Sequence, residues 1–295
     1  MVQHRLSLAI ITPSYSEDLE LCRDLTESVT RFTGETVKHF VLVPGKDKRA
    51  FEQIAGPRTV LQDVRSYLPP TLVKVPYFNC WLNLRQPFPP VRGWVAQQIV
   101  KLAAAAAMDT DVVLLVDSDV LLIRHIDAGS FAPGGELEFF EAPDGINESL
   151  PRHHLWHAVA RRLLGLPPVS RSLMPDYICW PCAWSPSIVR EMLQRVESVT
   201  GKPWATAIGG ELHFSEMILY GVYVREVLSR KEKPPTTTSM RCLNYSEESP
   251  LDESALKVLV QQAGPEDIAI MVSAKSGTPL SVRRRILGGF PVPDV

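Results

Sequence analysis

Short, continuous apolar runs alternate with segments of helical spacing along the first part of the chain. Residues 6–11, 38–43 and 112–116 are such runs, and they predict strands that are buried on both faces of a sheet. Between them, residues 16–29 and 93–108 repeat apolar positions three and four apart, which predicts amphipathic helices. This alternation is typical of an α/β domain whose mostly parallel central sheet is flanked by helices.

The rest of the chain gives weaker patterns. Residues 66–92 are rich in proline and aromatic residues and are expected to form a long surface loop. The other expected elements are a helix at 47–53, a strand at 59–61, a strand at 137–141 ended by a turn at 143–145, helices at 153–164, 186–199 and 211–221 (the last capped by Gly221), a strand-like segment at 177–184, a polar loop at 230–240 and a strand at 268–272. The 295 residues suffice for one large domain.

Two aspartates stand directly after the most apolar of these runs. Asp117 and Asp119 follow residues 112–116 with only Ser118 between them. The carboxyl ends of strands are where open α/β sheets bind ligands. Two anions without a neighbouring base are costly there unless a cation is present, and carboxylate oxygens suit Mg²⁺ or Mn²⁺. A divalent metal site is therefore predicted at Asp117 and Asp119, although a polar turn that merely ends a strand gives the same pattern.

Two further segments carry candidate chemistry. The polar stripe of the helix at 93–108 includes Gln97 and Lys101, which either face the same cleft as the aspartates or form a solvated face. Glu216 lies early in the expected helix 211–221 among apolar residues, a setting that favours a general base. Glu216 paired with a basic group such as Arg225 is the competing interpretation.

Composition narrows the class of function. The chain has 31 basic and 33 acidic residues, so it has no electrostatic footprint for nucleic acid. The cluster at 283–285 is either a local anion site or a solvated face, and the small-residue loop at 273–277 could cradle phosphate. The five cysteines are scattered, which favours buried free thiols in a reducing cytoplasm over a zinc or redox site. No run reaches the length of a spanning helix, so any membrane contact is expected to be peripheral.

Three segments in order resemble known proteins. They are residues 93–102 (GWVAQQIVKL), 116–119 (VDSD) and 214–223 (FSEMILYGVY). The Asp-x-Asp pattern after a strand resembles the GT-A class of nucleotide-sugar glycosyltransferases. The three segments together look like DUF6492, a family of bacterial proteins regarded as glycosyltransferases. The resemblance implies a single Rossmann-like GT-A domain over residues 1–295, with a nucleotide-donor half at 1–125 and an acceptor half of helices and loops at 126–295.

The resemblance also implies roles for individual residues. Asp117 and Asp119 would hold Mn²⁺ or Mg²⁺ on the donor diphosphate, and Glu216 would be the catalytic base, with Asp144 as runner-up. Glycogenin-like enzymes add a C-terminal metal-binding histidine, but no histidine follows His213 here, so no third ligand is assigned. The residues implied to bind the donor nucleotide or its sugar are Thr12, Pro13, Ser14, Tyr15, Gln97, Lys101 and Ser118.

The expected activity is therefore transfer of a sugar from a nucleoside-diphosphate donor, with UDP favoured, to a hydroxyl acceptor. A glycan, a lipid-linked sugar and a small molecule all remain open as acceptors, as do the stereochemistry and a homodimeric state. A nucleotidyltransferase that makes a nucleotide-sugar is one alternative. The acidic, glycine-free segment at 12–18 argues against it, because that class carries a glycine-rich basic loop there. A non-catalytic binding module is the other alternative.

Overall fold

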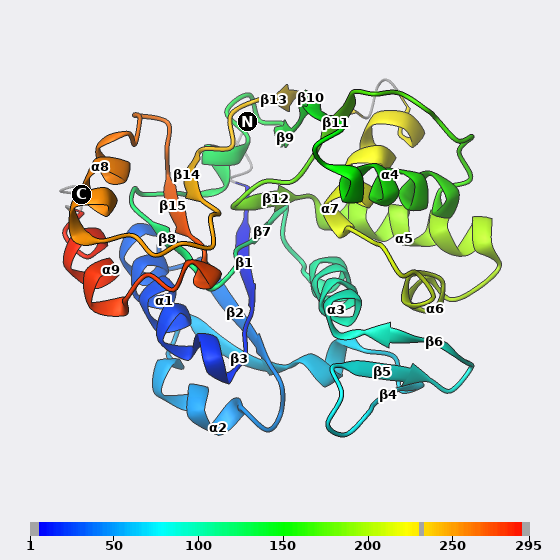
Figure 1. Cartoon of the computed structure of the whole chain (residues 1–295), viewed down its shortest axis with the longest axis horizontal. Helices are drawn as coiled ribbons and strands as arrows, with labels where there is room; N and C mark the ends of the chain where they lie inside the picture. Colours follow the sequence, from blue (N-terminus) through cyan, green and yellow to red (C-terminus); the bar gives the residue numbers. More distant parts are fainter. Residues whose placement is uncertain (1–5, 230–232, 291–295) are drawn as a thin grey trace, which may run out of the picture.

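The computed structural model describes residues 6–229 and 233–290. Its centre is a five-stranded sheet in the order β12-β7-β1-β2-β3, in which β7, β1, β2 and β3 are parallel and β12 is antiparallel (Figure 1). These strands are β1 (Leu8–Pro13), β2 (Lys38–Val43), β3 (Thr59–Asp63), β7 (Val112–Leu115) and β12 (Cys182–Trp184). The predicted α/β class with a mostly parallel central sheet is confirmed.

Helices cover both faces of this sheet. On one face, Leu8 and Ile10 of β1 pack with Leu25 of α1 (Leu19–Phe32). On the other face, alternate β1 residues pack against α3 (Gly93–Ala107). Successive side chains of a strand point to opposite faces, so a strand between two helical layers must be apolar throughout. Each such side chain contributes about 1.5–3 kcal/mol through burial, which explains the continuous runs in the sequence.

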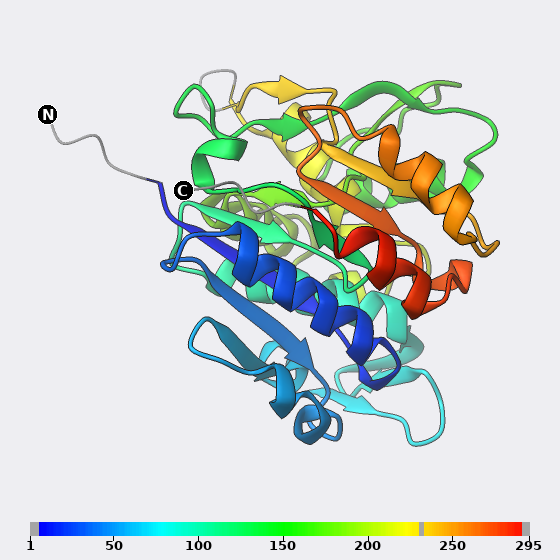
Figure 2. The ribbon, with the colours of Figure 1, turned by 90° about the vertical axis from the view of Figure 1, so that its left-hand side faces the viewer.

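A second sheet lies beside α1. It contains β14 (Cys242–Tyr245), β15 (Ala269–Val272) and β8 (Val120–Leu122), and α8 (Glu253–Gln261) and α9 (Leu280–Leu287) cover it (Figure 2). The predicted strand at 268–272 is thus confirmed as β15. Strand β8 was not predicted, because the apolar run at 120–123 is short and follows the run at 112–116 after only three polar residues.

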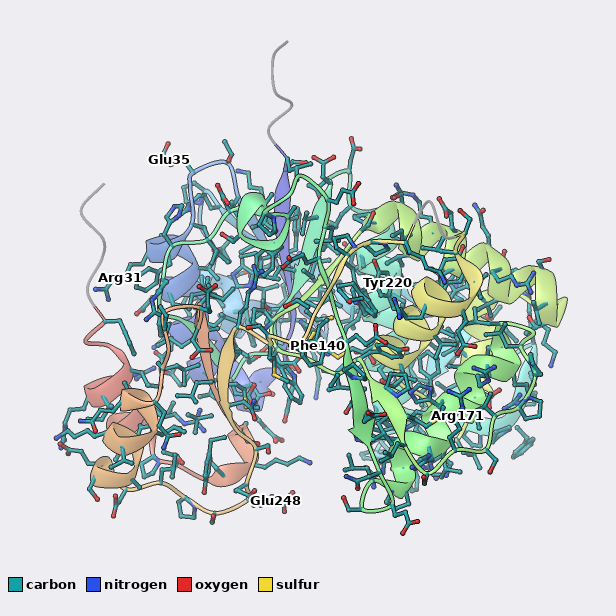
Figure 3. All side chains as sticks on the ribbon, turned by 90° about the horizontal axis from the view of Figure 1, so that it is seen from above. Arg31, Glu35, Phe140, Arg171, Tyr220 and Glu248 are labelled. Carbon is teal, nitrogen blue, oxygen red and sulfur yellow. The ribbon has the colours of Figure 1, made fainter. Side chains whose placement is uncertain are left out.

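Four helices form the opposite side of the molecule. They are α4 (Pro151–Leu163), α5 (Pro186–Thr200), α6 (Trp204–Gly209) and α7 (Glu216–Val222). Figure 3 shows Tyr220 and Arg171 on this side, Arg31 and Glu248 on the side of the second sheet, and Phe140 between them.

Two predicted boundaries on this side were wrong. Residues 211–214 precede the helix, which begins at Glu216 because the Ser215 hydroxyl caps it by accepting a hydrogen bond from the N–H of Ile218. Gly221 does not end the helix. α7 continues to Val222 and passes into a π-helical turn at Tyr223–Val227.

The expected loop at 66–92 was also wrong. It contains a three-stranded antiparallel sheet of β4 (Leu72–Lys74), β5 (Cys80–Asn83) and β6 (Gln86–Arg92). Prolines in β6 hid the strand pattern, because proline is more typical of loops. They are tolerated here because β6 is an edge strand, where a missing N–H breaks no hydrogen bond of the sheet.

The predicted turn at 143–145 lies instead inside a strand. This strand, β10 (Ala142–Ile146), pairs with β11 (Met174–Asp176), and the predicted strand at 137–141 is reduced to β9 (Phe139–Phe140). β9 pairs with β13 (Thr236–Thr237), so the expected polar loop is partly a strand; residues 230–232 of it lie outside the described residues. The short α2 (Lys48–Phe51) follows β2. Within the described ranges, no helix has the length and apolar character needed to cross a bilayer.

Candidate functional site

The two aspartates lie where β7 leaves the central sheet. Strand β7 is buried along its whole length, and the chain then passes through Asp117, Ser118 and Asp119 into β8 of the second sheet. The Ser118 hydroxyl donates a 2.9 Å hydrogen bond to the Ser14 hydroxyl in the segment after β1. The buried contact therefore holds the ends of β7 and β1 together.

Lys101 of α3 joins Asp117 to α7. Its Nζ lies 2.9 Å from Asp117 Oδ1 and 3.4 Å from Glu216 Oε1. Burial by itself lowers the pKa of Lys101, but the two carboxylates outweigh it and raise the pKa above its usual value. Lys101 is thus a fixed positive charge between two anions. Of the two earlier interpretations of Glu216, the ion pair is present, but its partner is Lys101, whereas Arg225 pairs with Glu141.

A backbone contact fixes the start of α7 on α3. The N–H of Glu216 donates a 2.8 Å hydrogen bond to Oε1 of Gln98, and both residues are buried. An N–H in the first turn of a helix has no partner within the helix, so a side-chain acceptor is needed when that end is buried. Nε2 of Gln98 has no hydrogen-bond partner among the described residues. Gln98 therefore positions Glu216, whereas the residue predicted for the site was its neighbour Gln97, which is exposed.

The loop after β15 holds Asp119. Its Oδ2 accepts a 2.9 Å hydrogen bond from the N–H of Ala274. Burial, followed by repulsion from Asp117, raises the pKa of Asp119, although the Ala274 hydrogen bond opposes the change. A phosphate cradle was predicted for the loop at 273–277, and it would need the backbone N–H groups of this loop as donors. The N–H of Ala274 already binds Asp119, so it is not free for a phosphate.

The segment after β1 adds more negative charge. Burial, then repulsion from Asp119, Glu17 and Asp117, raises the pKa of Asp18 to about 6. Burial and the charges of Asp18, Glu17 and Asp119 also raise the pKa of Tyr15. Tyr15, Asp18, Asp117 and Asp119 therefore interact electrostatically, and carboxylates outnumber basic groups around them.

The four donor residues expected at the end of β1 lie in two environments. Thr12, Pro13 and Ser14 are buried, and the Thr12 hydroxyl is 2.8 Å from Nε2 of His39. Only Tyr15 exposes much of its side chain. Asp144, the second candidate base, is exposed on β10, a strand outside the central sheet. The geometry thus brings together Lys101, Asp117, Ser118, Asp119 and Glu216, with Tyr15 beside them, and leaves Gln97 and Asp144 outside the ion-paired group.

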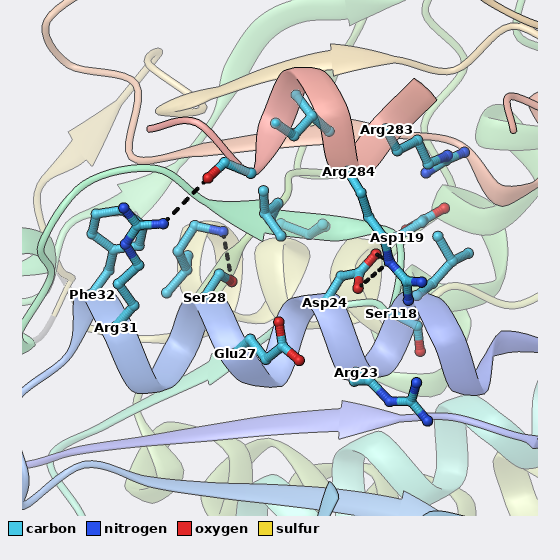
Figure 4. A pocket seen from close by; sticks show the side chains of 16 residues that line it. Arg23, Asp24, Glu27, Ser28, Arg31, Phe32, Ser118, Asp119, Arg283 and Arg284 are labelled. Atoms are coloured by element: carbon cyan, nitrogen blue, oxygen red, sulfur yellow. Dashed lines mark hydrogen bonds and ion pairs between the residues drawn. The ribbon is translucent and has the colours of Figure 1, made fainter. Parts of the chain in front are cut away.

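A cavity of about 500 Å³ reaches Ser118 and Asp119 from the side of α1 and α9 (Figure 4). Its arginines are occupied by the protein. Arg284 binds Asp24 and Glu20, and Arg283 is buried and donates to the carbonyls of residues 272, 273 and 278. The third residue of this cluster, Arg285, pairs with Glu253. The cluster at 283–285 therefore joins α9 to its surroundings, and nothing in these contacts indicates an anion site.

The carboxylates around Asp117 fit a cation whose remaining ligands come from substrate phosphates and water. Among the described residues, no group of three or more histidine, cysteine or acidic side chains is arranged to hold a metal. Mg²⁺, however, commonly binds one or two carboxylates together with substrate phosphates and water. The mutual repulsion of Asp18, Asp117 and Asp119 is the feature that such a cation would relieve.

The cysteines are in the free state. Cys22, Cys179, Cys182 and Cys242 are buried and Cys80 is half-buried. Burial raises the pKa of Cys182 well above its usual value, and its hydrogen bond with Cys179 acts in the same direction. Since the thiolate is the reactive form, the environment favours the inert, structural thiols that were expected.

Comparison with known proteins gives one family and no activity. No curated protein matches the chain. A model of DUF6492, described as a family of unknown function, matches residues 2–253. This span contains the whole group around Lys101, Asp117 and Glu216, and the chain therefore belongs to the DUF6492 family.

Proposed function

We propose that this protein is a metal-dependent glycosyltransferase that uses a nucleoside-diphosphate sugar as donor. The observation that carries the proposal is the convergence of Asp117, Lys101 and Glu216, from three separate segments, at the exit of a buried parallel strand. Ligand sites of open α/β sheets lie at such strand ends. A GT-A arrangement of the domain, with the donor on the side of β1 and β7, is part of this proposal.

The proposed donor site uses the acidic pair and the exposed ring beside it. Asp117 and Asp119 would hold a divalent cation together with the two donor phosphates. Bound there, the cation supplies Lewis-acid stabilisation of the nucleoside diphosphate as it leaves. Tyr15, exposed at the end of β1, offers an aromatic face for the base. Thr12 is not included in this donor site, because its hydroxyl is buried against His39.

The proposed chemistry assigns the proton to Glu216. In transfer with inversion, the acceptor oxygen bonds to the anomeric carbon, the bond from that carbon to the diphosphate breaks, and the hydroxyl proton passes to the Glu216 carboxylate. Lys101 fixes the distance between Glu216 and Asp117, and Gln98 fixes the start of α7. Glu216 is preferred over Asp144 because only Glu216 shares an ion-paired group with a proposed cation ligand.

Calorimetry with UDP, GDP, CDP and ADP, each with and without Mn²⁺, tests the donor site. We expect one diphosphate to bind only with the cation, and Asp119→Asn to abolish this binding. The matched control is Asp109→Asn, an exposed aspartate just before the amino end of β7. Absence of binding for all four nucleotides would rule out the donor site and favour a strand end without a ligand.

A second measurement separates the reactions. Release of the diphosphate from a matching nucleotide-sugar is expected for the intact chain, and Glu216→Gln should reduce it while nucleotide binding persists. Production of pyrophosphate from a nucleoside triphosphate and a sugar phosphate would instead identify a nucleotidyltransferase. The negative field of Asp18, Asp117 and Asp119 disfavours this alternative, because a triphosphate carries more negative charge into the same place.

A further inference from the structure

The sheet formed by β4, β5 and β6 exposes an unusual amount of apolar surface. Tyr77 is 105% exposed, Phe88 77% and Phe78 67%, and Leu84 is exposed to a similar degree. Tyr77 and Phe78 lie in the loop between β4 and β5, and Phe88 lies within β6 (Figure 1, lower right). Several large exposed apolar side chains on one small sheet mark an interaction site more often than scattered single residues do.

The strand register explains why the fold does not need these side chains. Leu72 pairs with Asn83 and Trp81 with Val91, and Leu72, Asn83 and Val91 are buried towards the protein. Val73 and Leu82 form the next pair along the sheet, so their side chains lie on the opposite face, away from the body of the protein. One face of the sheet thus packs on the body of the protein, while the other presents apolar residues to the surroundings.

The backbone of the β4–β5 loop keeps an aromatic ring outside. Tyr77 adopts a φ of 65°, the left-handed region that bulky residues rarely occupy. Such a conformation costs about 1–2 kcal/mol for an L-residue other than glycine, and the fully exposed ring makes no compensating contact with the core. A strained residue held outward is a reason to look for a partner beyond the chain.

The charged side chains of the β4–β6 sheet and its surroundings, residues 65–107, are all basic. Between Val64 and Met108 the chain contains no aspartate or glutamate. It contains five basic residues, namely Arg65, Lys74, Arg85, Arg92 and Lys101, of which the first four belong to or adjoin the sheet and are exposed. Lys202 extends this basic region by a 3.0 Å hydrogen bond from Nζ to Gln86 of β6. The nearby Glu211 is neutralised by Arg162.

We propose that the exposed face and loops of the β4–β6 sheet dock on an anionic lipid membrane. Aromatic and apolar side chains partition into the interface of a bilayer, and basic residues around them attract acidic headgroups. The surface offers both in one place. A protein that adds a strand to β6 is a poorer fit, because Pro87, Pro89 and Pro90 lack the N–H groups that such pairing needs.

The docking surface adjoins the candidate site through α3. β6 ends at Arg92 and α3 begins at Gly93, so Lys101 lies about 12 Å along the same helix. A membrane under the sheet would therefore lie close to the group around Lys101. This gives a rationale for an acceptor carried by a lipid, but membrane binding itself requires neither a nucleotide nor Glu216.

Co-sedimentation of the full chain with vesicles tests the proposal. We expect binding to vesicles of phosphatidylglycerol mixed with phosphatidylcholine, weaker binding at high salt, and little binding to phosphatidylcholine alone. The variant Arg85→Gln/Arg92→Gln should lower the partition coefficient about 25-fold, since each basic residue near the surface is worth about fivefold. The variant Tyr77→Ser/Phe78→Ser should reduce binding to both kinds of vesicle.

Two control variants make the result specific. Val258→Ser changes an exposed apolar residue of α8, and Lys46→Gln removes an exposed charge after β2, and both should bind like the parent chain. All variants should keep the parent thermal midpoint, because each altered side chain is exposed.

Three results would overturn the proposal. They are no binding of the parent chain to anionic vesicles, binding that survives in both docking-surface variants, and equal loss in the control variants. Self-association in light scattering that Tyr77→Ser/Phe78→Ser abolishes, with no vesicle binding, would assign the surface to a protein interface instead. Nucleotide binding is measured separately, so failure here leaves the proposed activity standing, and the reverse also holds.

Discussion

Nζ of Lys101 lies 3.4 Å from Oε1 of Glu216, and both residues are buried, with only 7% and 5% of their surfaces exposed. The pair joins α3 to α7 across the interior. Lys101 also lies 2.9 Å from Asp117, so one ammonium group serves two carboxylates. Losing the ammonium group would leave the buried carboxylate of Glu216 without its counter-charge, and it would also remove the partner of the half-buried Asp117.

Removal of the ammonium group should therefore be strongly destabilising. We expect Lys101→Met to lower the free energy of unfolding by about 3–5 kcal/mol, as when one partner of a buried pair is lost. Urea unfolding monitored by circular dichroism measures this. Combining Lys101→Met with Glu216→Leu should recover part of the loss, because the remaining buried anion is removed. If the single variant is as stable as the parent chain, the ion-paired group does not hold α3 and α7 together.

The two neighbouring glutamines of α3 should differ sharply. Gln98→Leu removes the acceptor for the N–H of Glu216 and should cost about 1–3 kcal/mol, the range for an unsatisfied buried donor. Gln97→Leu changes an exposed position and should stay within about 0.5 kcal/mol of the parent chain. Thermal and urea unfolding of both variants checks this. Equal effects would mean that the hydrogen bond to Glu216 contributes nothing specific.

The choice between these glutamines illustrates what the sequence could predict. Continuous apolar runs correctly predicted β1, β2 and β7, because burial on both faces leaves a pattern that few other structures produce. Glu216 stood out as an acid in an apolar segment, and Lys101 as part of the polar stripe of its helix. Helical spacing, however, places Gln97 and Gln98 on the same broad stripe. Packing of Ile99 and its neighbours on the sheet decides which amide turns inward.

Other misses have a different cause. The strands β4, β5 and β6 each depend on partners that only the folded chain supplies, and the prolines of β6 read as loop residues. The short α6 (Trp204–Gly209) gives too few turns to show a period. Asp18 was considered only as part of the acidic segment 12–18, because its proximity to Asp119 arises from the meeting of β1 with β7.

Asp18 predicts a stability that depends on pH. The pKa of Asp18 is about 6 in the folded chain and 3.8 in the unfolded chain, so folding favours the protonated form. The ionised group therefore opposes folding above pH 6, and this cost disappears as the pH falls towards 4. Asp18→Asn should stabilise the protein at pH 8 by about 1 kcal/mol, a figure reduced because half the side chain faces water.

Thermal unfolding of Asp18→Asn at pH 8 and at pH 4 measures the effect. The gain should be absent at pH 4, where the native carboxyl is largely protonated in the folded chain. Glu35→Gln, at an exposed acid after the carboxyl end of α1 that does not contribute to the pKa of Asp18, is the control and should change stability little at either pH. A gain of equal size at both values would point to better helix capping rather than relieved repulsion.

His39 predicts the opposite pH dependence. Complete burial lowers its pKa from 6.5 to about 3, so the folded chain binds a proton less readily than the unfolded chain. Its contribution to stability is complete above pH 6.5 and falls as the pH drops towards 3. Between pH 7 and pH 5 the loss from this residue is about 2 kcal/mol. His39→Gln should remove most of this dependence in urea unfolding, whereas His125→Gln, at an exposed histidine, should leave it as it is.

Helix α7 packs closely on the ring of Tyr177, and this contact depends on the absence of a side chain at Gly221. A Cβ at this glycine would lie 2.1 Å from Cγ of the Tyr177 ring, well inside contact distance. Gly221→Ala should therefore destabilise the protein by roughly 1–3 kcal/mol through overpacking, even though alanine favours a helix by about 1 kcal/mol. Gly34→Ala, where nothing lies within 4 Å of the added carbon, is the control and should be tolerated.

A displaced α7 would also move its first residue, Glu216, relative to Lys101. Urea unfolding of Gly221→Ala, alone and combined with Tyr177→Leu, separates the two effects. The smaller side chain should relieve the clash and restore part of the stability, because the added methyl group then meets a branched aliphatic chain that can turn aside. An unchanged midpoint in Gly221→Ala would show that the contact with Tyr177 yields easily, and that the position of Glu216 does not depend on this glycine.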